Sequence, residues 1–205
     1  MNHLFMSILS LLLTFSPIMQ PYPTTLSAAS STQCVNGTII LDDMETIEIW
    51  PAKDKSKTIL LHVTPASYIA DAVSGRPAAL GERKDDTVVA YYKADGFGVN
   101  NAVALIINIP EDFSPPVYAR AARVSRVGDQ TYVLTDGGVI VTITDETSIE
   151  PFLTGDLASM DDIAGNSDLL LWNQAYNMSI PARTAANRVV ILGQSKPEGS
   201  PGIAE

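Results

Sequence analysis

The amino-acid sequence predicts an all-β protein with short helices, built from two copies of one small unit. Short runs of alternating or fully apolar residues recur along the chain, and Gly, Pro, Asn and Asp separate them, as is typical of strands and turns. One phrase is written twice, since ILLHVTPASYI at 59–69 is followed eighty positions later by VIVTITDETSI at 139–149. Strand-like segments surround both phrases in the same order, which indicates a duplicated unit.

Each copy contains five predicted strands. In the first copy they are expected at 34–41, 45–50, 57–64, 86–92 and 101–109, with an irregular or helical segment at 67–82. In the second copy they are expected at 117–127, 131–135, 139–144, 168–172 and 187–192. Asp136-Gly137 predicts a tight hairpin between two of these strands, because Gly tolerates a positive φ.

A short helix is expected before the fourth strand of the second copy. Asp156 is placed to cap it, Leu157, Met160 and Ile163 form its apolar face, and Gly165 ends it. Each copy then has the order β-β-β-α-β-β, which is the order of a five-stranded, partly open Greek-key barrel of the OB type. We therefore expect a tandem pair of five-stranded OB-like β-barrels.

The segment IPEDFSPPVY carries the predicted boundary, because Pro110, Pro115 and Pro116 oppose a continuing central strand. The predicted barrel units span 30–109 and 117–193, with a Pro-rich linker at 110–116. A tail at 194–205, rich in Pro, Gly, Ser and Glu, is expected to be disordered. The alternative is one continuous β-sandwich in which the two copies share strands.

An apolar run near the start, LFMSILSLLLTFSPIM, predicts a secretory signal peptide at 1–29. Ser27 and Ala29 are the small residues expected just before a cleavage site, and the run is shorter than a typical transmembrane helix. The first residues carry no Lys or Arg, so an uncleaved anchor is the alternative. We expect a secreted, extracellular or cell-surface protein that leaves the membrane after cleavage.

Composition argues against several classes of partner. A formal net charge of −10 disfavours nucleic acid and anionic membrane surfaces, because both are bound through Lys and Arg. Cys34 is the one cysteine, so no internal disulfide is expected. It is either a small buried or edge residue near the first strand or the site of an intermolecular disulfide.

No familiar catalytic or metal-binding pattern is present. His62 lies inside a predicted strand and matches Thr142 of the other copy, which predicts an outward-facing residue rather than a catalytic base. One His and one Cys cannot build a zinc or copper site, and we expect no cofactor. The acidic clusters at 42–45 and 161–168 are candidates for calcium, with turns and helix caps as the other interpretation. A carboxylate-based hydrolase is a further alternative.

The most distinctive stretch is DLLLWNQAYNMSIPARTAANRVVIL at 168–192. It resembles the end of small secreted OB-like β-barrel domains of Gram-positive bacteria, sometimes found beside copper-amine-oxidase-like N-terminal modules. The matching residues are Trp172, Ser179, Pro181, Ala182, Thr184 and the run VVIL at 189–192, with TDET at 144–147 upstream. The resemblance implies a barrel, and no catalytic residue carries over from it. It covers the second copy well, and it reaches the first copy only through the internal repeat.

The loops before the two final strands, at 93–101 and 173–186, differ in length and chemistry although the strands match. Loops are free to differ and often carry recognition, so partner contacts are expected there. Trp172 and Tyr91 occupy matching positions and are expected in the core, with a ligand-binding barrel rim as the alternative. The predicted binding residues are Tyr176, Met178, Pro181, Arg183 and Phe97.

These observations predict a non-enzymatic secreted or cell-surface β-barrel protein that acts by protein binding or assembly in the wall or extracellular matrix. Its partner would be an extracellular protein or a cell-wall component, and self-association is compatible with this role. The alternative is a small-ligand or glycan binder, or an inhibitor of an extracellular enzyme.

Overall fold

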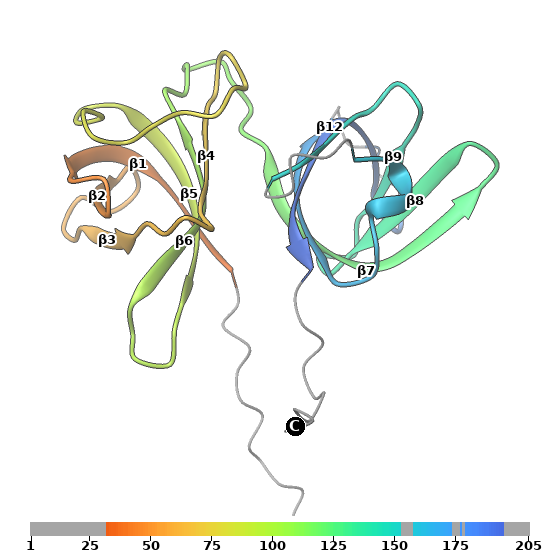
Figure 1. Ribbon diagram of the computed structural model, residues 1–205, viewed down its shortest axis with the longest axis horizontal. Coiled ribbons are helices and arrows are strands. Elements are labelled where there is room, and N and C mark those ends of the chain that lie inside the picture. Colours follow the sequence, from red (N-terminus) through yellow and green to blue (C-terminus); the bar gives the residue numbers. More distant parts are fainter. Residues whose placement is uncertain (1–31, 153–157, 174–176, 178, 195–205) are drawn as a thin grey trace, which may run out of the picture.

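The computed structural model describes residues 32–152, 158–173, 177 and 179–194, and their regular structure is almost entirely β-strand (Figure 1). The first six strands are β1 (Gln33–Asp42), β2 (Thr46–Pro51), β3 (Ile59–His62), β4 (Tyr68–Asp71), β5 (Thr87–Ala94) and β6 (Asn100–Ile107). The other elements are β7 (Val117–Val127), β8 (Gln130–Thr135), β9 (Ile140–Ile143), β10 (Ser148–Pro151), the 3-10 turn η1 (Met160–Asp162), β11 (Ser167–Asn173) and β12 (Arg183–Gln194).

Some predictions fall outside the described residues. They are the signal peptide at 1–29, the helix cap at Asp156, the binding residues Tyr176 and Met178, and most of the tail at 194–205. These remain predictions.

Five strands of the first sheet form a closed β-barrel. Their order is β3-β2-β1-β5-β6, and β3 also pairs with β6, which joins the two edges. In the second sheet, β9-β8-β7-β11-β12 are neighbours in the same order, and β9 pairs with β12. Closure leaves few exposed strand edges. The two sheets share no strand in the described part of the chain, which contradicts the alternative of one continuous sandwich. The boundaries proposed around 110–116 stay a prediction.

The helical alternative for 67–82 is wrong, and so is the short helix expected before β11, where the structure describes these segments. Segment 67–82 contains β4, a strand that pairs in parallel with β6, and β10 pairs with β12 in the same way. Among the described residues 158–166 the regular structure is η1, which Ser159 caps and which ends where Ile163 returns to an extended conformation. Gly75, with a φ of 65°, also prevents a helix from continuing through 67–82.

The repeated phrase builds the same turn in both copies. The Ser67 hydroxyl accepts a hydrogen bond from the Thr64 amide at 3.0 Å and donates to the Ala102 carbonyl at 2.7 Å. Thr147 occupies the matching place and donates to the Ala186 carbonyl at 2.8 Å. The turn therefore fastens the chain after the third strand of each barrel to the last strand. This contact explains why the phrase includes a hydroxyl residue at this position in both copies.

Each barrel has its own apolar core. Residues that alternate inward along the strands supply it, as expected for sheets with one buried face. Fully buried members of the first core include Ile39, Ile47, Ile49, Leu61 and Leu105. The corresponding members of the second include Val133, Ile143, Ile163, Leu169 and Val189.

A third apolar cluster joins the two barrels. The first barrel contributes the outer face of β4, β5 and β6, and the second contributes the matching face of β11 and β12. Tyr91 pairs with Ala104 on the last strand of the first barrel, and Trp172 pairs with Arg188 at the matching position of the second barrel. The predicted match between Tyr91 and Trp172 is therefore confirmed. Both rings, however, lie in the cluster between the barrels rather than inside one barrel. The cluster also contains an edge-to-face contact between Tyr68 and Phe152, with ring centroids 5.1 Å apart.

Charged groups border this cluster. Arg188 donates to Glu150 of its own barrel at 2.6 Å and to the Gly75 carbonyl of the other barrel at 2.9 Å. Its guanidinium also lies over the Trp172 ring. On another side, Lys93 of the first barrel pairs with Asp168 of the second at 3.2 Å. The two barrels are therefore held by apolar packing with directional polar contacts at its margin.

Candidate binding site

A groove lies between β3 and the β5–β6 hairpin of the first barrel. Its volume is about 540 Å³. Leu60 and Val99 expose 53% and 40% of their surface, and Tyr92 donates to Gln33 at 2.9 Å. The groove therefore combines exposed apolar side chains with polar groups. The lining residues are Gln33, Thr58, Ile59, Leu60, His62, Tyr92, Gly98, Val99 and Asn100.

The groove exists because β3 and β6 separate there. One residue pair, His62 with Asn101, joins these strands. Beyond it, β6 stays with β5, and the pair Ala94–Asn100 continues the hairpin away from β3. The first barrel is therefore closed at one point of this seam and open beside it.

The second barrel closes the same seam more fully. Three residue pairs join β9 to β12, and the Ile140 amide donates to the Ala182 carbonyl at 2.9 Å. Leu60 is the matching residue of the first barrel. Its carbonyl accepts from the Asn100 side chain at 3.3 Å, whereas its amide has no backbone partner among the residues that the structure describes. The open seam thus leaves a backbone donor facing the groove.

A structured turn next to the groove-lining residues Gly98 and Val99 keeps Phe97 exposed to solvent. Phe97 is 96% exposed at the tip of the β5–β6 hairpin. The Asp95 carboxylate accepts from the amides of Phe97 and Val99 at 2.8 and 2.9 Å. These bonds lower the pKa of Asp95, and the bond from the Val99 amide makes the largest contribution. The exposure of Phe97 is therefore a property of a hydrogen-bonded turn.

A second hollow continues from the groove, since Thr58 and Ile59 line both. It measures about 650 Å³ and lies between β1 and the loop that joins β2 to β3. Lys53 and Lys57 line it, and Lys55 of the same loop lies over the half-exposed ring of Trp50 at the end of β2. The loop therefore concentrates three lysines in a chain whose net charge is −10.

The predicted binding residues that the structure describes lie on different barrels. Phe97 belongs to the first barrel, and Pro181 and Arg183 belong to the second, where both are exposed. Arg183 pairs with Ile140 at the β9–β12 seam. Phe97 directly precedes the groove-lining residues Gly98 and Val99 in the chain, whereas Leu60 and the lysines were missed by sequence reasoning. The loop PAKDKSK gave a signal for the lysines, but no local pattern marked the open seam.

His62 is exposed on β3, which confirms the predicted outward orientation. Cys34 is an exposed free thiol on β1, not a buried residue, and it lines the hollow. Neighbouring atoms nevertheless remove water from the sulfur itself, and this desolvation raises the pKa of the thiol. The reactive thiolate is therefore disfavoured.

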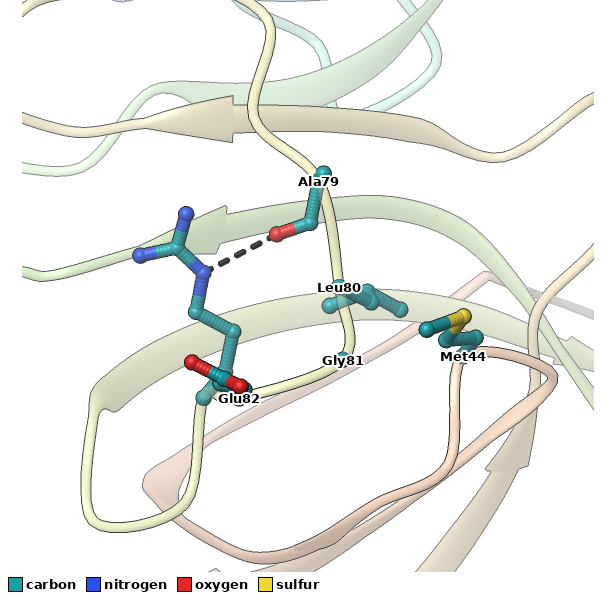
Figure 2. Close-up of a pocket in the computed structure, with 6 residues that line it drawn as sticks. Met44, Ala79, Leu80, Gly81 and Glu82 are labelled. Atoms are coloured by element: carbon teal, nitrogen blue, oxygen red, sulfur yellow. Dashed lines mark hydrogen bonds between the residues drawn. The ribbon is translucent and has the colours of Figure 1, made fainter.

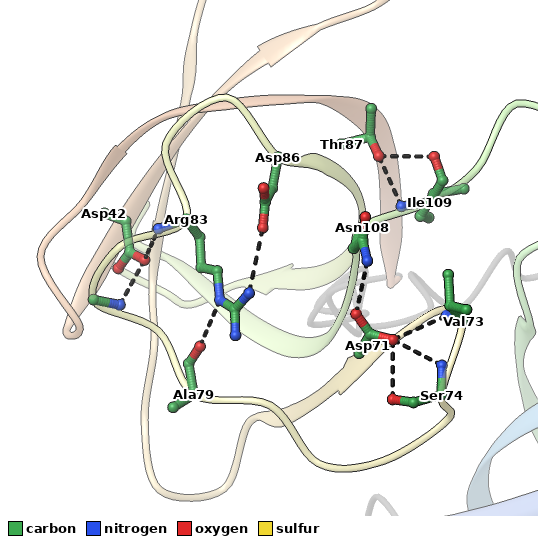
Figure 3. A network of polar contacts seen from close by, with 11 residues as sticks. Asp42, Asp71, Val73, Ser74, Ala79, Arg83, Asp86, Thr87, Asn108 and Ile109 are labelled. Atoms are coloured by element: carbon green, nitrogen blue, oxygen red, sulfur yellow. Dashed lines mark hydrogen bonds and ion pairs between the residues drawn. The ribbon is translucent and has the colours of Figure 1, made fainter.

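The acidic clusters proposed for calcium stabilise turns instead. Asp42 accepts from the amides of Gly81 and Arg83 at 2.6 and 3.1 Å, which ties a loop to β1 (Figure 3). In the second cluster, Asp162 accepts from the Ser159 amide at 2.7 Å, which caps η1. Across the described residues, no group of three His, Cys, Asp or Glu side chains is arranged to hold a metal ion.

A further hollow of about 450 Å³ lies beside Met44 and residues 79–83 (Figure 2). Arg83 lines it and donates to the Ala79 carbonyl at 2.9 Å. Its guanidinium also pairs with Asp86 at 3.6 Å. Because internal contacts occupy the charged side chain, this hollow offers fewer groups to a ligand than the groove at β3.

In the part of the chain that the structure describes, no helix has the length and apolar character needed to cross a membrane. Comparison with known proteins finds neither a matching family model nor a matching curated protein. The resemblance to Gram-positive barrel domains therefore stays a prediction, and function has to be argued from the geometry of the groove.

Proposed function

We propose that this chain is a non-enzymatic, exported protein that binds a partner protein at the open seam of its first barrel. The carrying observation is Phe97, an aromatic side chain that is 96% exposed and directly precedes the groove-lining residues Gly98 and Val99 in the chain. Burying such surface contributes about 25 cal/mol per Å², and aromatic anchors dominate many interfaces. The proposal includes a tandem pair of OB-like barrels, which the order of strands in both sheets supports.

The partner is proposed to be an extracellular protein or a protein component of the cell wall. Export is supported by the apolar N-terminal run and the small residues before position 30. A binding role is supported by the placement of the hydrophobic groups around a groove, since exposed apolar side chains beside a concave surface are typical of interaction sites.

Affinity capture from a secretome tests this function. Purified wild-type protein is compared with Phe97→Ser and with the double variant Tyr176→Ala/Arg183→Ala, after melting temperatures show that all three fold. We expect Phe97→Ser to reduce the captured partner at least about tenfold, as loss of an interface anchor does. Full capture by Phe97→Ser together with loss in the double variant would move the site to the loop at 173–186.

A small ligand is the second candidate, and the hollow beside Cys34 favours it. Its volume of about 650 Å³ falls within the usual range for small-molecule sites. A ligand that binds only the folded protein raises the melting temperature, so a screen of glycans and apolar anions by thermal shift distinguishes this candidate. A hit that Lys53→Ala or Ala52→Trp removes would support it.

A further inference from the structure

We infer that the open seam accepts an extended peptide segment of the partner as an added strand on β3, with acidic residues of that segment at the lysine loop, defined as residues 51–58. This inference rests on the proposed function and specifies the chemistry of the partner. It joins two observations: a backbone edge without its strand and a basic surface at the end of that edge.

The edge is defined by the pairing of β3. In an antiparallel pair, alternate residues direct their backbone groups toward the neighbour and away from it. The Val63 amide donates to Glu45 on the β2 side, so Leu60 and His62 direct theirs toward β6. His62 meets Asn101, whereas the Leu60 amide has no backbone partner among the described residues. An added strand would satisfy this donor.

The second barrel shows how a strand fits this position. Residues 182–185 of the chain run parallel to β9, and the Ala182 carbonyl accepts from the Ile140 amide. In the first barrel the matching stretch, 98–101, turns back with β5 as a hairpin and leaves the place open. The incoming peptide would take the position that residues 182–184 hold in the second barrel. Its side chains on the groove side would contact Leu60 and Val99.

Charge gives the peptide its composition and direction. Lys53, Lys55 and Lys57 precede β3, and Asp54 in the same loop is hydrogen-bonded to the Ser56 hydroxyl at 2.5 Å. A peptide strand parallel to β3 would start beside the N-terminal end of β3, where these lysines lie. Acidic residues are therefore expected at the start of the peptide. The rest of the protein is acidic and would repel such a segment, which favours the lysine loop over other surfaces.

The test uses synthetic peptides and the purified protein. The probe begins with two glutamates followed by alternating valines and threonines, and amide NMR spectra record binding up to millimolar concentration. A second peptide has N-methylated amides at alternate residues, which removes strand hydrogen bonds. A third has lysines in place of the glutamates. We expect shifts at Leu60, His62 and Val99 with the first peptide, and at least about tenfold weaker binding by the others, equivalent to about 1.4 kcal/mol.

Variants of the protein test whether the lysine loop attracts the acidic residues of the peptide. Lys53→Glu/Lys57→Glu should weaken the acidic peptide about tenfold and improve the lysine peptide, whereas Lys84→Glu, a matched change of an exposed lysine elsewhere, should change neither. Equal binding of the N-methylated peptide would overturn strand addition. Equal binding to Lys53→Glu/Lys57→Glu would overturn the acidic specificity, and no shift at β3 with any peptide would overturn the inference. Loss of secretome capture by Phe97→Ser would still support partner binding in that case.

Discussion

The two barrels differ most where the third strand meets the last strand. In the second barrel the start of β12 leaves β11 and pairs with β9 at three residues. In the first, the start of β6 stays paired with β5, and only His62 and Asn101 join β3 to β6. The strand sequence is similar, so the loop decides the outcome. A short turn at 95–99 keeps the β5–β6 hairpin together, whereas more residues separate β11 from β12 in the sequence.

This difference teaches that one duplicated unit can keep its fold in both copies and still offer backbone groups for binding in only one. The closed seam contributes stability, because its backbone groups are satisfied within the chain. The open seam gives up part of that stability and leaves a donor for a partner. The largest expected effects of mutation should therefore lie on the closed seam.

The first prediction tests the difference between the two seams with matched proline substitutions. Ile140→Pro removes the amide that donates to Ala182, so it should lower the free energy of unfolding by about 2–3 kcal/mol. Leu60→Pro is the matching change at the open seam and should cost about 1 kcal/mol, since no backbone bond of that amide is lost. Urea unfolding measures both values. Equal losses would show that the first seam is closed in solution.

The second prediction concerns the contact between the barrels. Gly75 has a φ of 65°, and a Cβ there would lie 2.5 Å from the Arg188 guanidinium. Gly75→Ala should therefore cost about 2 kcal/mol, from backbone strain together with displacement of Arg188.

Gly128→Ala is the control for this change. Gly128 has a φ of 61°, and nothing lies within 4 Å of its Cβ position, so the variant measures backbone strain alone, about 1 kcal/mol. Thermal unfolding compares the two variants. If they lose the same stability, Arg188 does not contribute through Gly75.

The third prediction concerns the turn that occurs after the third strand in each barrel. Ser67 is buried, and Ser67→Ala leaves the Ala102 carbonyl without its hydroxyl donor, which should cost about 1–2 kcal/mol. Thr147→Val makes the same change at a less buried site and should cost about 1 kcal/mol. Denaturant unfolding of both variants provides the measurement. A loss in one copy alone would show that the turn is not equally important in both.

The fourth prediction is the smallest and concerns pH. The folded pKa of Asp95 is lowered, so its contribution to the hairpin is complete above the unfolded value near 4 and is lost as the pH falls through the folded pKa. Amide exchange at Phe97 and Val99, corrected for intrinsic rates, should accelerate in this acidic range. Asp95→Ala should show fast exchange at all pH values. Equal protection of Phe97 and Val99 in the wild type and in Asp95→Ala at pH 6 would contradict the role given to Asp95.

Much of the fold could be predicted because strands and turns have local signals. The alternating segments correspond to ten of the strands, and the repeat correctly matched Tyr91 with Trp172. β4 and β10 were missed because strands of four residues hardly show alternation, and their pairing with distant parallel strands leaves no local pattern.

The site could be predicted only in part. Phe97 was identified from its loop, and its exposure is a local consequence of the Asp95 turn. The open seam was missed because it depends on which of two strands pairs with residues 98–101, a choice made in three dimensions. The location of Trp172 between the barrels was missed for the same reason, since alternation identifies a buried face but not the surface that covers it.

The apolar cluster between the barrels suggests how such a chain could originate. Equivalent strands supply both of its sides, so a single ancestral copy with this face exposed would form a homodimer through like surfaces. Fusion of two gene copies would make that dimer permanent and independent of concentration. Each half could then change separately. One such divergence is the position that holds Ala104 in the first copy and Arg188 in the second. Specialisation of one binding edge would follow from the same freedom.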